Sequence, residues 1–179
     1  MSENLKGSCY CKKVQFEVKK SAKPMSGHCH CTDCRTWTSC AFFTACILKP
    51  GDLVYTKGEE YIKTIKNKVQ RNFCGECGTR LHNEIPDKFL SIPLALLSNE
   101  FIKDNKPIPS KLKPNFHIYY KERMLNVCDG KPKLHDLPKQ GGGTGKIMWF
   151  SWISEWVPTL LAVGLSGYVA YDKYLKFKF

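Results

Sequence analysis

The chain has 179 residues, ten of them cysteines, and a formal net charge of +12 at pH 7. This length accommodates one ordinary domain with an apolar core plus an appendage. The first residues, MSENLK, have neither a basic leader followed by an apolar run nor a small-residue cleavage site, so we expect a reducing compartment. The cysteine content is therefore not interpreted as the disulfide framework of a small secreted protein.

Strand patterns separated by turn residues dominate the first 140 residues. Apolar side chains alternate with polar ones at Val14, Phe16 and Val18, as in a half-buried strand. Further short runs with strand character occupy residues 41–48, 61–66, 89–97 and 117–120. Proline and glycine fall between these runs, and no long helical period appears before residue 140. The sequence predicts a small, mainly β domain with many loops.

Seven cysteines form three closely spaced clusters. They are Cys9 and Cys11, then Cys29, Cys31 and Cys34, and finally Cys74 and Cys77. Such short spacings suit a shared metal better than intrachain disulfides, although a redox dithiol or plain buried thiols are alternatives. Four thiolates close a tetrahedral zinc site, whereas three leave one position for water or a substrate. Two plus two plus three cysteines therefore predict one structural and one reactive zinc.

The remaining three cysteines fall outside these clusters. Cys40 and Cys46 lie in an apolar stretch, and Cys128 stands alone. We expect all three to be small buried hydrophobic side chains, because cysteine without a ligand role is among the most buried residue types.

Polar residues beside the central cluster are candidates for assisting roles. Arg35 directly follows Cys34, and we expect it either to grip a substrate carboxylate as a bidentate fork or to remain a surface charge. His30 lies between two candidate ligands, so alternation points its ring away from the metal and into a supporting role; the alternative is a role as fourth ligand. His117 sits in an apolar run and is interpreted as a core histidine with satisfied hydrogen bonds.

Five segments together carry a resemblance to a known family. They are residues 7–16, 29–35, 73–79, 115–119 and 129–132, which read GSCYCKKVQF, CHCTDCR, FCGECGT, NFHIY and DGKP. In this order and with these gaps, they resemble the glutathione-dependent formaldehyde-activating family across residues 7 to about 138. The resemblance implies an Mss4-like fold of twisted antiparallel sheets with zinc knuckles.

The same resemblance implies two zinc ions per chain with different tasks. A structural zinc would be held by Cys9, Cys11, Cys74 and Cys77. A second, labile zinc would occupy an open site formed by Cys29, Cys31 and Cys34. The family reaction condenses glutathione with formaldehyde to S-hydroxymethylglutathione. The chain is therefore expected to be a carbon–sulfur lyase resembling S-(hydroxymethyl)glutathione synthase, with Arg35 as a contact to the substrate carboxylate.

Two segments depart from the family pattern. The family usually has a glycine within a few residues of the arginine, whereas this chain reads TWTSCAF, with Ser39 at its centre. The tryptophan expected after the His-Ile-Tyr run is absent, and residues 123–126 read RMLN in its place. A side chain at Ser39 would narrow the approach to the second zinc, so the preferred thiol and aldehyde are left open.

The C-terminal forty residues differ in composition from the β domain, which we assign to residues 5–138. Residues 139–146 have the composition of a glycine-rich linker. Residues 147–171 contain a single charge, at Glu155, and are long enough to span a bilayer as a helix. A basic tip, residues 172–179, follows. We expect a transmembrane tail that anchors the β domain to a membrane on the cytosolic side; the alternative is a helix packed against the domain or a partner.

The positive charge indicates a second class of function. About +10 of the net charge lies on residues 1–140, where lysines are spread along the chain without an arginine-rich block. This charge is that of a soluble basic face, and it would also steer an acidic substrate such as glutathione. The alternative function is a non-catalytic, zinc-stabilised binding protein whose basic surface recruits an acidic partner, such as nucleic acid, an acidic protein tail or anionic lipid.

Overall fold

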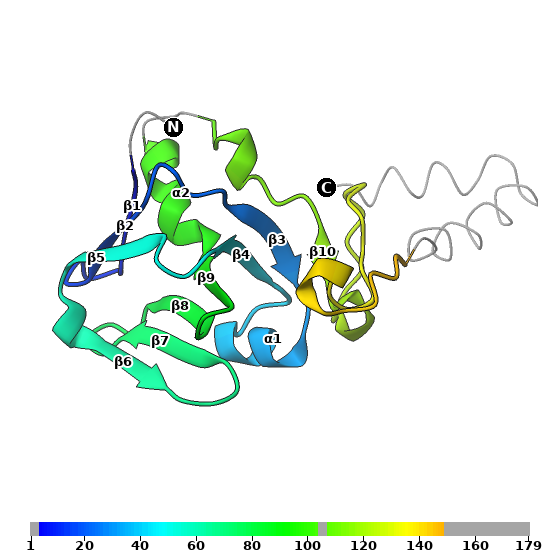
Figure 1. Ribbon diagram of the computed structural model, residues 1–179, viewed down its shortest axis with the longest axis horizontal. Coiled ribbons are helices and arrows are strands. Elements are labelled where there is room, and N and C mark those ends of the chain that lie inside the picture. Colours follow the sequence, from blue (N-terminus) through cyan, green and yellow to red (C-terminus); the bar gives the residue numbers. More distant parts are fainter. Residues whose placement is uncertain (1–3, 104–106, 149–179) are drawn as a thin grey trace, which may run out of the picture.

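The computed structural model describes residues 4–103 and 107–148, which form two β-sheets (Figure 1). The smaller sheet is antiparallel, in the order β1 (Leu5–Ser8), β2 (Gln15–Val18) and β5 (Leu53–Lys57). The larger sheet has the order β10 (His117–Ile118), β3 (Met25–Cys29), β4 (Phe43–Leu48), β9 (Phe89–Pro93), β8 (Arg80–Ile85), β7 (Gln70–Cys74) and β6 (Ile62–Ile65). The prediction of a mainly β fold is confirmed, and the predicted C-terminal helix, residues 147–171, lies outside the described residues except for its first two.

Strand direction in the larger sheet changes at one place. Its neighbouring strands are antiparallel, except that β10 runs parallel to β3. This pairing brings His117 beside His28 and Ile118 beside Cys29. A segment late in the sequence therefore lies directly next to the central cysteine cluster.

The main apolar core lies between the two sheets. Val14, Phe16 and Val18 are each at most 1% exposed, which confirms the alternation predicted there. They pack in one cluster with Leu81 of β8 and Ile92 of β9. Burial of these side chains is the main driving force that holds the smaller sheet on the larger one.

A ten-residue helix, α2 (Leu94–Lys103), completes this core, and the sequence prediction was wrong here. The run 89–97 is a strand through Pro93 and a helix from Leu94 onward. Leu94, Leu97 and Phe101 fall on one helical face and pack into the main core, so the helix contacts β1, β4 and β9. A continuous apolar run did not distinguish a strand from the first turn of a buried helix.

The segment after β10 folds back beside β3, at the right of Figure 1. Among the described residues, the three-residue 3-10 helices are η1 (Glu59–Tyr61), η2 (Ser110–Leu112), η3 (Tyr120–Glu122) and η4 (Lys139–Gly141). Backbone hydrogen bonds tie the end of the glycine-rich segment to the preceding residues. The amide of His135 donates to the carbonyl of Lys146 at 2.8 Å, and the amide of Met148 donates to the carbonyl of Lys133 at 2.7 Å. Across residues 4–103 and 107–148, no helix is long and apolar enough to cross a bilayer.

Candidate functional site

Four cysteines from two distant loops meet at one point. Cys9 and Cys11 lie in the turn between β1 and β2, while Cys74 ends β7 and Cys77 lies in the turn before β8. The Sγ atoms of Cys9 and Cys11 are 3.4 Å apart, those of Cys11 and Cys74 are 3.9 Å apart, and all four lie within 4.8 Å of one another. Sulfur ligands at about 2.3 Å from a tetrahedral zinc are about 3.8 Å apart. The four-cysteine cluster therefore fits a metal ion.

Two tight turns place these sulfurs. In one turn, the amide of Gly78 donates to the carbonyl of Cys74 at 2.8 Å, and Gly78 has a φ of +72°, which glycine adopts without strain. In the other, the amide of Val14 donates to Sγ of Cys9 at 3.3 Å. The Tyr10 amide donates to Oγ1 of Thr79 at 3.0 Å and joins the two turns. The hydrogen bonds of the two turns hold the sulfurs close together.

The thiols of this cluster differ in how readily they ionise. Burial raises the pKa of Cys9 to about 12. At Cys77 burial also acts upward, but hydrogen bonds with Thr79 and neighbouring groups lower the pKa to about 6. A bound cation would be needed to hold the buried Cys9 as a thiolate at neutral pH.

The three cysteines of the central cluster also meet. Cys29 ends β3, Cys31 is the N-cap of α1 (Thr32–Thr38), and Cys34 lies in the first turn of that helix. Sγ of Cys29 is 3.4 Å from Sγ of Cys31, and all three sulfurs lie within 4.8 Å of one another. The Cys34 amide donates to Sγ of Cys31 at 3.4 Å. This cluster offers a metal three sulfur ligands and leaves one tetrahedral position open.

Close contact spreads the pKa values of these three thiols. Hydrogen bonds from the thiols of Cys29 and Cys34 lower the pKa of Cys31 to about 3. The same contacts, with burial, raise the pKa of Cys29. At Cys34 the contact with Cys29 acts downward, but the contact with Cys31 and burial raise the pKa to about 12. Of the three thiols, that of Cys31 ionises most readily, and a thiolate is a soft anionic ligand for a metal.

A chain of hydrogen bonds supports the turn between Cys29 and Cys31. Nε2 of His30 is 2.8 Å from Nδ1 of His117, and Nε2 of His117 is 3.0 Å from Oδ2 of Asp129. The ionised carboxylate of Asp129 accepts a hydrogen bond from the Nε2–H of His117. The Nδ1 of His117 then accepts a hydrogen bond from the Nε2–H of His30. Both histidines are fully buried, and burial lowers the pKa of His30 to about 4. His30 and His117 therefore act as neutral supports, as their sequence positions predicted.

A third group of ligand-type residues is already satisfied without a metal. Side chains of His28, His117 and Asp129 lie within 4.8 Å of one another. However, Nζ of Lys131 and Nζ of Lys133 contact the Asp129 carboxylate at 2.6 Å and 3.1 Å. These contacts and the one from His117 lower the pKa of Asp129 despite burial. Two ammonium groups occupy the place that a cation would take.

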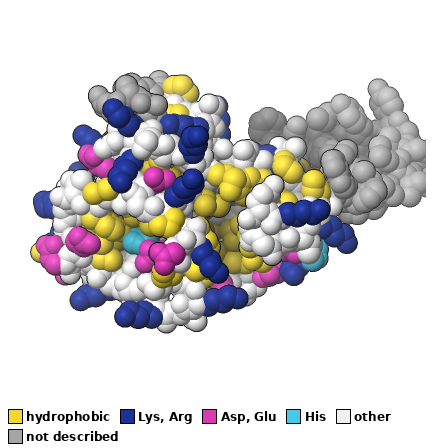
Figure 2. All heavy atoms as spheres, in the orientation of Figure 1, with side chains coloured by type: hydrophobic (Ala, Val, Ile, Leu, Met, Phe, Trp, Pro, Cys, Tyr) yellow, Lys and Arg dark blue, Asp and Glu magenta, His cyan; other side chains and the backbone are white. Residues whose placement is uncertain are grey.

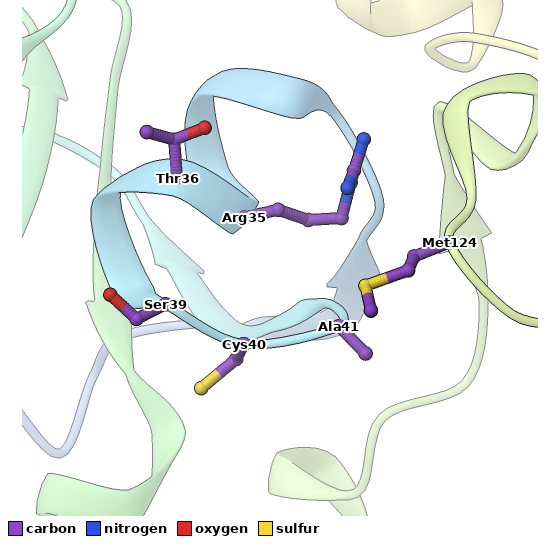
Figure 3. Close-up of a pocket in the computed structure, with 6 residues that line it drawn as sticks. All are labelled: Arg35, Thr36, Ser39, Cys40, Ala41 and Met124. Atoms are coloured by element: carbon purple, nitrogen blue, oxygen red, sulfur yellow. The ribbon is translucent and has the colours of Figure 1, made fainter.

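Arg35 lies on α1 and lines a hollow of about 270 Å³, in which Figure 3 shows it reaching toward the segment that carries Met124. Its Nε donates to the carbonyl of His30 at 3.1 Å, and its Nη2 donates to Oγ1 of Thr32 at 3.3 Å. Ser39 lines the same hollow. The expected contact between Arg35 and a substrate carboxylate stays a prediction.

The expectation for the remaining cysteines was right for one and wrong for two. Cys46 is fully buried in β4, as predicted. Cys40 and Cys128 are exposed. The apolar stretch enters the sheet only at Phe43, so Cys40 lies in the preceding bend rather than in the strand. Cys128 lies in the loop before Asp129, where a lone residue carries no periodic signal of burial.

Sequence reasoning missed an aromatic and cationic group next to the central cluster. Cζ of Arg80 and Cζ of Arg71 lie 4.9 Å and 5.5 Å from the centre of the Trp37 ring, and the Phe73 ring meets it edge-on at 6.1 Å. Trp37 follows Cys34 by one helical turn, and Arg71 and Phe73 alternate on β7. These two spacings are the signal that the sequence offers. The side chains themselves come together only when β7 packs against α1.

Comparison with known proteins agrees with the cysteine pattern. Residues 4–122 match the family model described as glutathione-dependent formaldehyde-activating enzyme, which covers more than half of the chain. Comparison with curated proteins gave no match. Among solved structures, the crystal structure of a Rhodobacter sphaeroides protein is 23% identical with a TM-score of 0.45, and the alignment covers 58% of this chain and 97% of that chain.

Proposed function

Because the chain belongs to the glutathione-dependent formaldehyde-activating family, we propose that it is a zinc-dependent carbon–sulfur lyase. It joins a thiol such as glutathione to formaldehyde or another small aldehyde, and it cleaves the adduct in the reverse direction. The observation that carries this proposal is the three-sulfur cluster of Cys29, Cys31 and Cys34, which has one ligand fewer than a closed zinc site.

The two cysteine clusters suit different roles for two zinc ions. The cluster of four would hold a structural ion, because its ligands already fill a tetrahedron. The cluster of three would hold the reactive ion. When bound there, zinc supplies Lewis acidity and stabilises thiolate or developing negative charge on oxygen.

The proposed reaction is an addition that balances without an oxidant or reductant. The sulfur of the thiol forms a bond to the carbonyl carbon, the π pair of the carbonyl moves to oxygen, and that oxygen takes up a proton. The thiol releases one proton, so the product is the S-hydroxymethyl adduct. In this step α1 fixes Cys31 and Cys34, while the hydrogen bond from His30 to His117 keeps the turn beside Cys29 in place.

The positive charge of the chain supports an acidic thiol as substrate. Figure 2 shows lysine and arginine side chains spread over the visible face rather than gathered into one patch. A spread positive field raises the local concentration of a small anion without a specific docking surface. The distribution on this face favours steering of the substrate over recruitment of an acidic macromolecule.

The proposal also includes attachment to a membrane through residues 147–171, with the β domain on the cytosolic side. Its support is the length and single charge of that segment, most of which lies outside the described residues. Carbonate extraction of membranes from cells that express the full chain tests this attachment. The protein is expected in the pellet, and complete release into the soluble fraction would contradict it.

The catalytic proposal is tested with carbon-13 formaldehyde and glutathione, by measuring the exchange between free aldehyde and adduct by NMR. The zinc-loaded full chain is expected to accelerate exchange above the spontaneous rate, and Cys31→Ser to reduce that acceleration roughly 100-fold. Cys40→Ser serves as the matched control, because Cys40 is exposed and belongs to neither cluster. Equal acceleration by Cys31→Ser and the wild type would refute the proposal.

A further inference from the structure

Arg71 lies beside the central cysteine cluster although it is far from it in sequence. Its guanidinium packs on Trp37, which follows Cys34 by three residues on the same side of α1. Phe73, two residues along β7, packs against the same ring and fixes the approach of strand to helix. This packing places the guanidinium of Arg71 about one helical turn from Cys34, on the side of α1 that faces β7.

One hydrogen-bond donor of Arg71 is left without an acceptor among the described residues. Its Nη1 is buried without a hydrogen-bond partner among the described residues, and none of their carboxylates lies within 4.0 Å of it. A buried donor without an acceptor costs about 1–3 kcal/mol, so such a group calls for an acceptor that the protein itself does not supply.

The two other arginines near α1 are already engaged. Arg35 donates from Nε and Nη2 to acceptors in its own turn, and Arg80 donates from Nε to the carbonyl of Trp37. Arg80 also packs on the Trp37 ring at 4.9 Å, so the ring is shared by two guanidinium groups. Of the three, Arg71 is the one whose guanidinium has a buried nitrogen without a hydrogen-bond partner among the described residues.

We propose that Arg71 binds a carboxylate of the thiol substrate and so selects acidic thiols. This inference rests on the proposed function, which brings the substrate sulfur to the cluster of Cys29, Cys31 and Cys34. In a short peptide thiol, each residue spans roughly 3.5 Å, so a carboxylate one residue from the cysteinyl sulfur lies several ångströms away from it. Three residues, a rise of about 4.5 Å, separate Cys34 from Trp37 along α1, and Arg71 is stacked on Trp37. The planar guanidinium can then form two parallel hydrogen bonds to the carboxylate.

Binding of S-methylglutathione to the zinc-loaded full chain tests this role without any turnover. Its blocked sulfur cannot react, and its diethyl ester lacks both carboxylates. By calorimetry, the wild type is expected to bind the free acid at least about 10-fold more tightly than the diester, as a charge-assisted contact predicts. Arg71→Gln is expected to abolish that preference, and Arg80→Gln, the control on the same ring, to keep it.

Several outcomes would overturn the inference. They are no binding of S-methylglutathione by the wild type, an unchanged preference in Arg71→Gln, or a loss of preference in Arg35→Gln instead. If Arg71→Gln does not fold, Arg71→Lys keeps the charge but not the fork and is expected to lose part of the preference; a full preference there would contradict the proposal. The NMR exchange rate is read separately, so failure of the lyase activity is distinguishable from failure of this contact.

Discussion

His82 links the two sheets through both of its ring nitrogens. Its Nδ1 is 2.6 Å from Oη of Tyr55 on β5, and its Nε2 is 3.0 Å from Nδ2 of Asn72 on β7. Oγ1 of Thr64 donates in turn to Oδ1 of Asn72 at 2.6 Å. Burial lowers the pKa of His82 to about 4, below its ordinary 6.5. The neutral ring accepts from Asn72, which a protonated ring cannot do.

This pKa makes the stability of the protein depend on pH. Between pH 6.5 and 4 the unfolded chain binds a proton at His82 that the folded chain does not. The contribution of His82 is therefore complete above pH 6.5 and falls as the pH drops, by about 2 kcal/mol at pH 5. Urea unfolding of the zinc-loaded wild type and of His82→Gln gives the free energy of unfolding at pH 7 and pH 5. The wild type is expected to lose about 2 kcal/mol more between these two pH values than the variant does. An equal pH dependence in both proteins would contradict the assignment.

The end of α1 explains one departure from the family pattern at the level of an element. Ser39 is the C-cap of this helix, with φ 55° and ψ 36° in the left-handed region. This conformation costs conformational energy for a residue with a side chain, whereas glycine adopts it without that cost. The glycine that the family usually has in this part of the chain matches that requirement.

Replacing Ser39 by glycine is therefore expected to be stabilising. The gain is up to about 1 kcal/mol, because relief of strain exceeds the entropy that glycine adds to the unfolded chain. Thr36→Gly, inside the same helix, is the matched control and is expected to destabilise by about 0.5–1 kcal/mol. Urea unfolding compares the two variants, and a destabilised Ser39→Gly would show that the left-handed cap is not strained.

Elements with a periodic signal were predicted from the sequence, and those without one were not. Alternation indicated β2 and β6. Apolar runs indicated β4 and β9, and the second of these runs also led to the wrong prediction of a strand at the start of α2. Strands such as β3 and β7 contain buried polar residues, for example Ser26 and Asn72, and carry no such alternation. The cost of burying Asn72 is offset by hydrogen bonds that form only when β6, β7 and β8 pair. Local patterns do not contain that information.

The same distinction applies to the site. The grouping of its seven cysteines was predicted from their short spacings together with the family resemblance, and the structure brings the sulfurs together in two clusters. Trp37 and Arg71 come together only through the packing of α1 on β7, over a separation of 34 positions in the sequence. The contact between these two side chains forms only in the tertiary structure, so no local spacing in the sequence predicts it.

At the scale of the whole molecule, the four-cysteine cluster connects the two sheets. Cys9 and Cys11 belong to the turn of the smaller sheet, and Cys74 and Cys77 belong to the larger one. A zinc bound there exists only in the folded chain, so its binding free energy, on the order of 10 kcal/mol, stabilises the fold directly. The cluster of Cys29, Cys31 and Cys34 lies within a single local turn and joins no distant elements.

The zinc content of purified protein tests this division most directly, measured by mass spectrometry of the metal in the wild type, Cys31→Ser and Cys74→Ser. Two zinc ions are expected in the wild type, and one in a folded Cys31→Ser, while Cys74→Ser is expected to be largely unfolded. Mild chelation is expected to remove one ion from the wild type and none from Cys31→Ser. A single zinc in the wild type, retained unchanged in Cys31→Ser, would contradict a reactive zinc at the three-cysteine cluster.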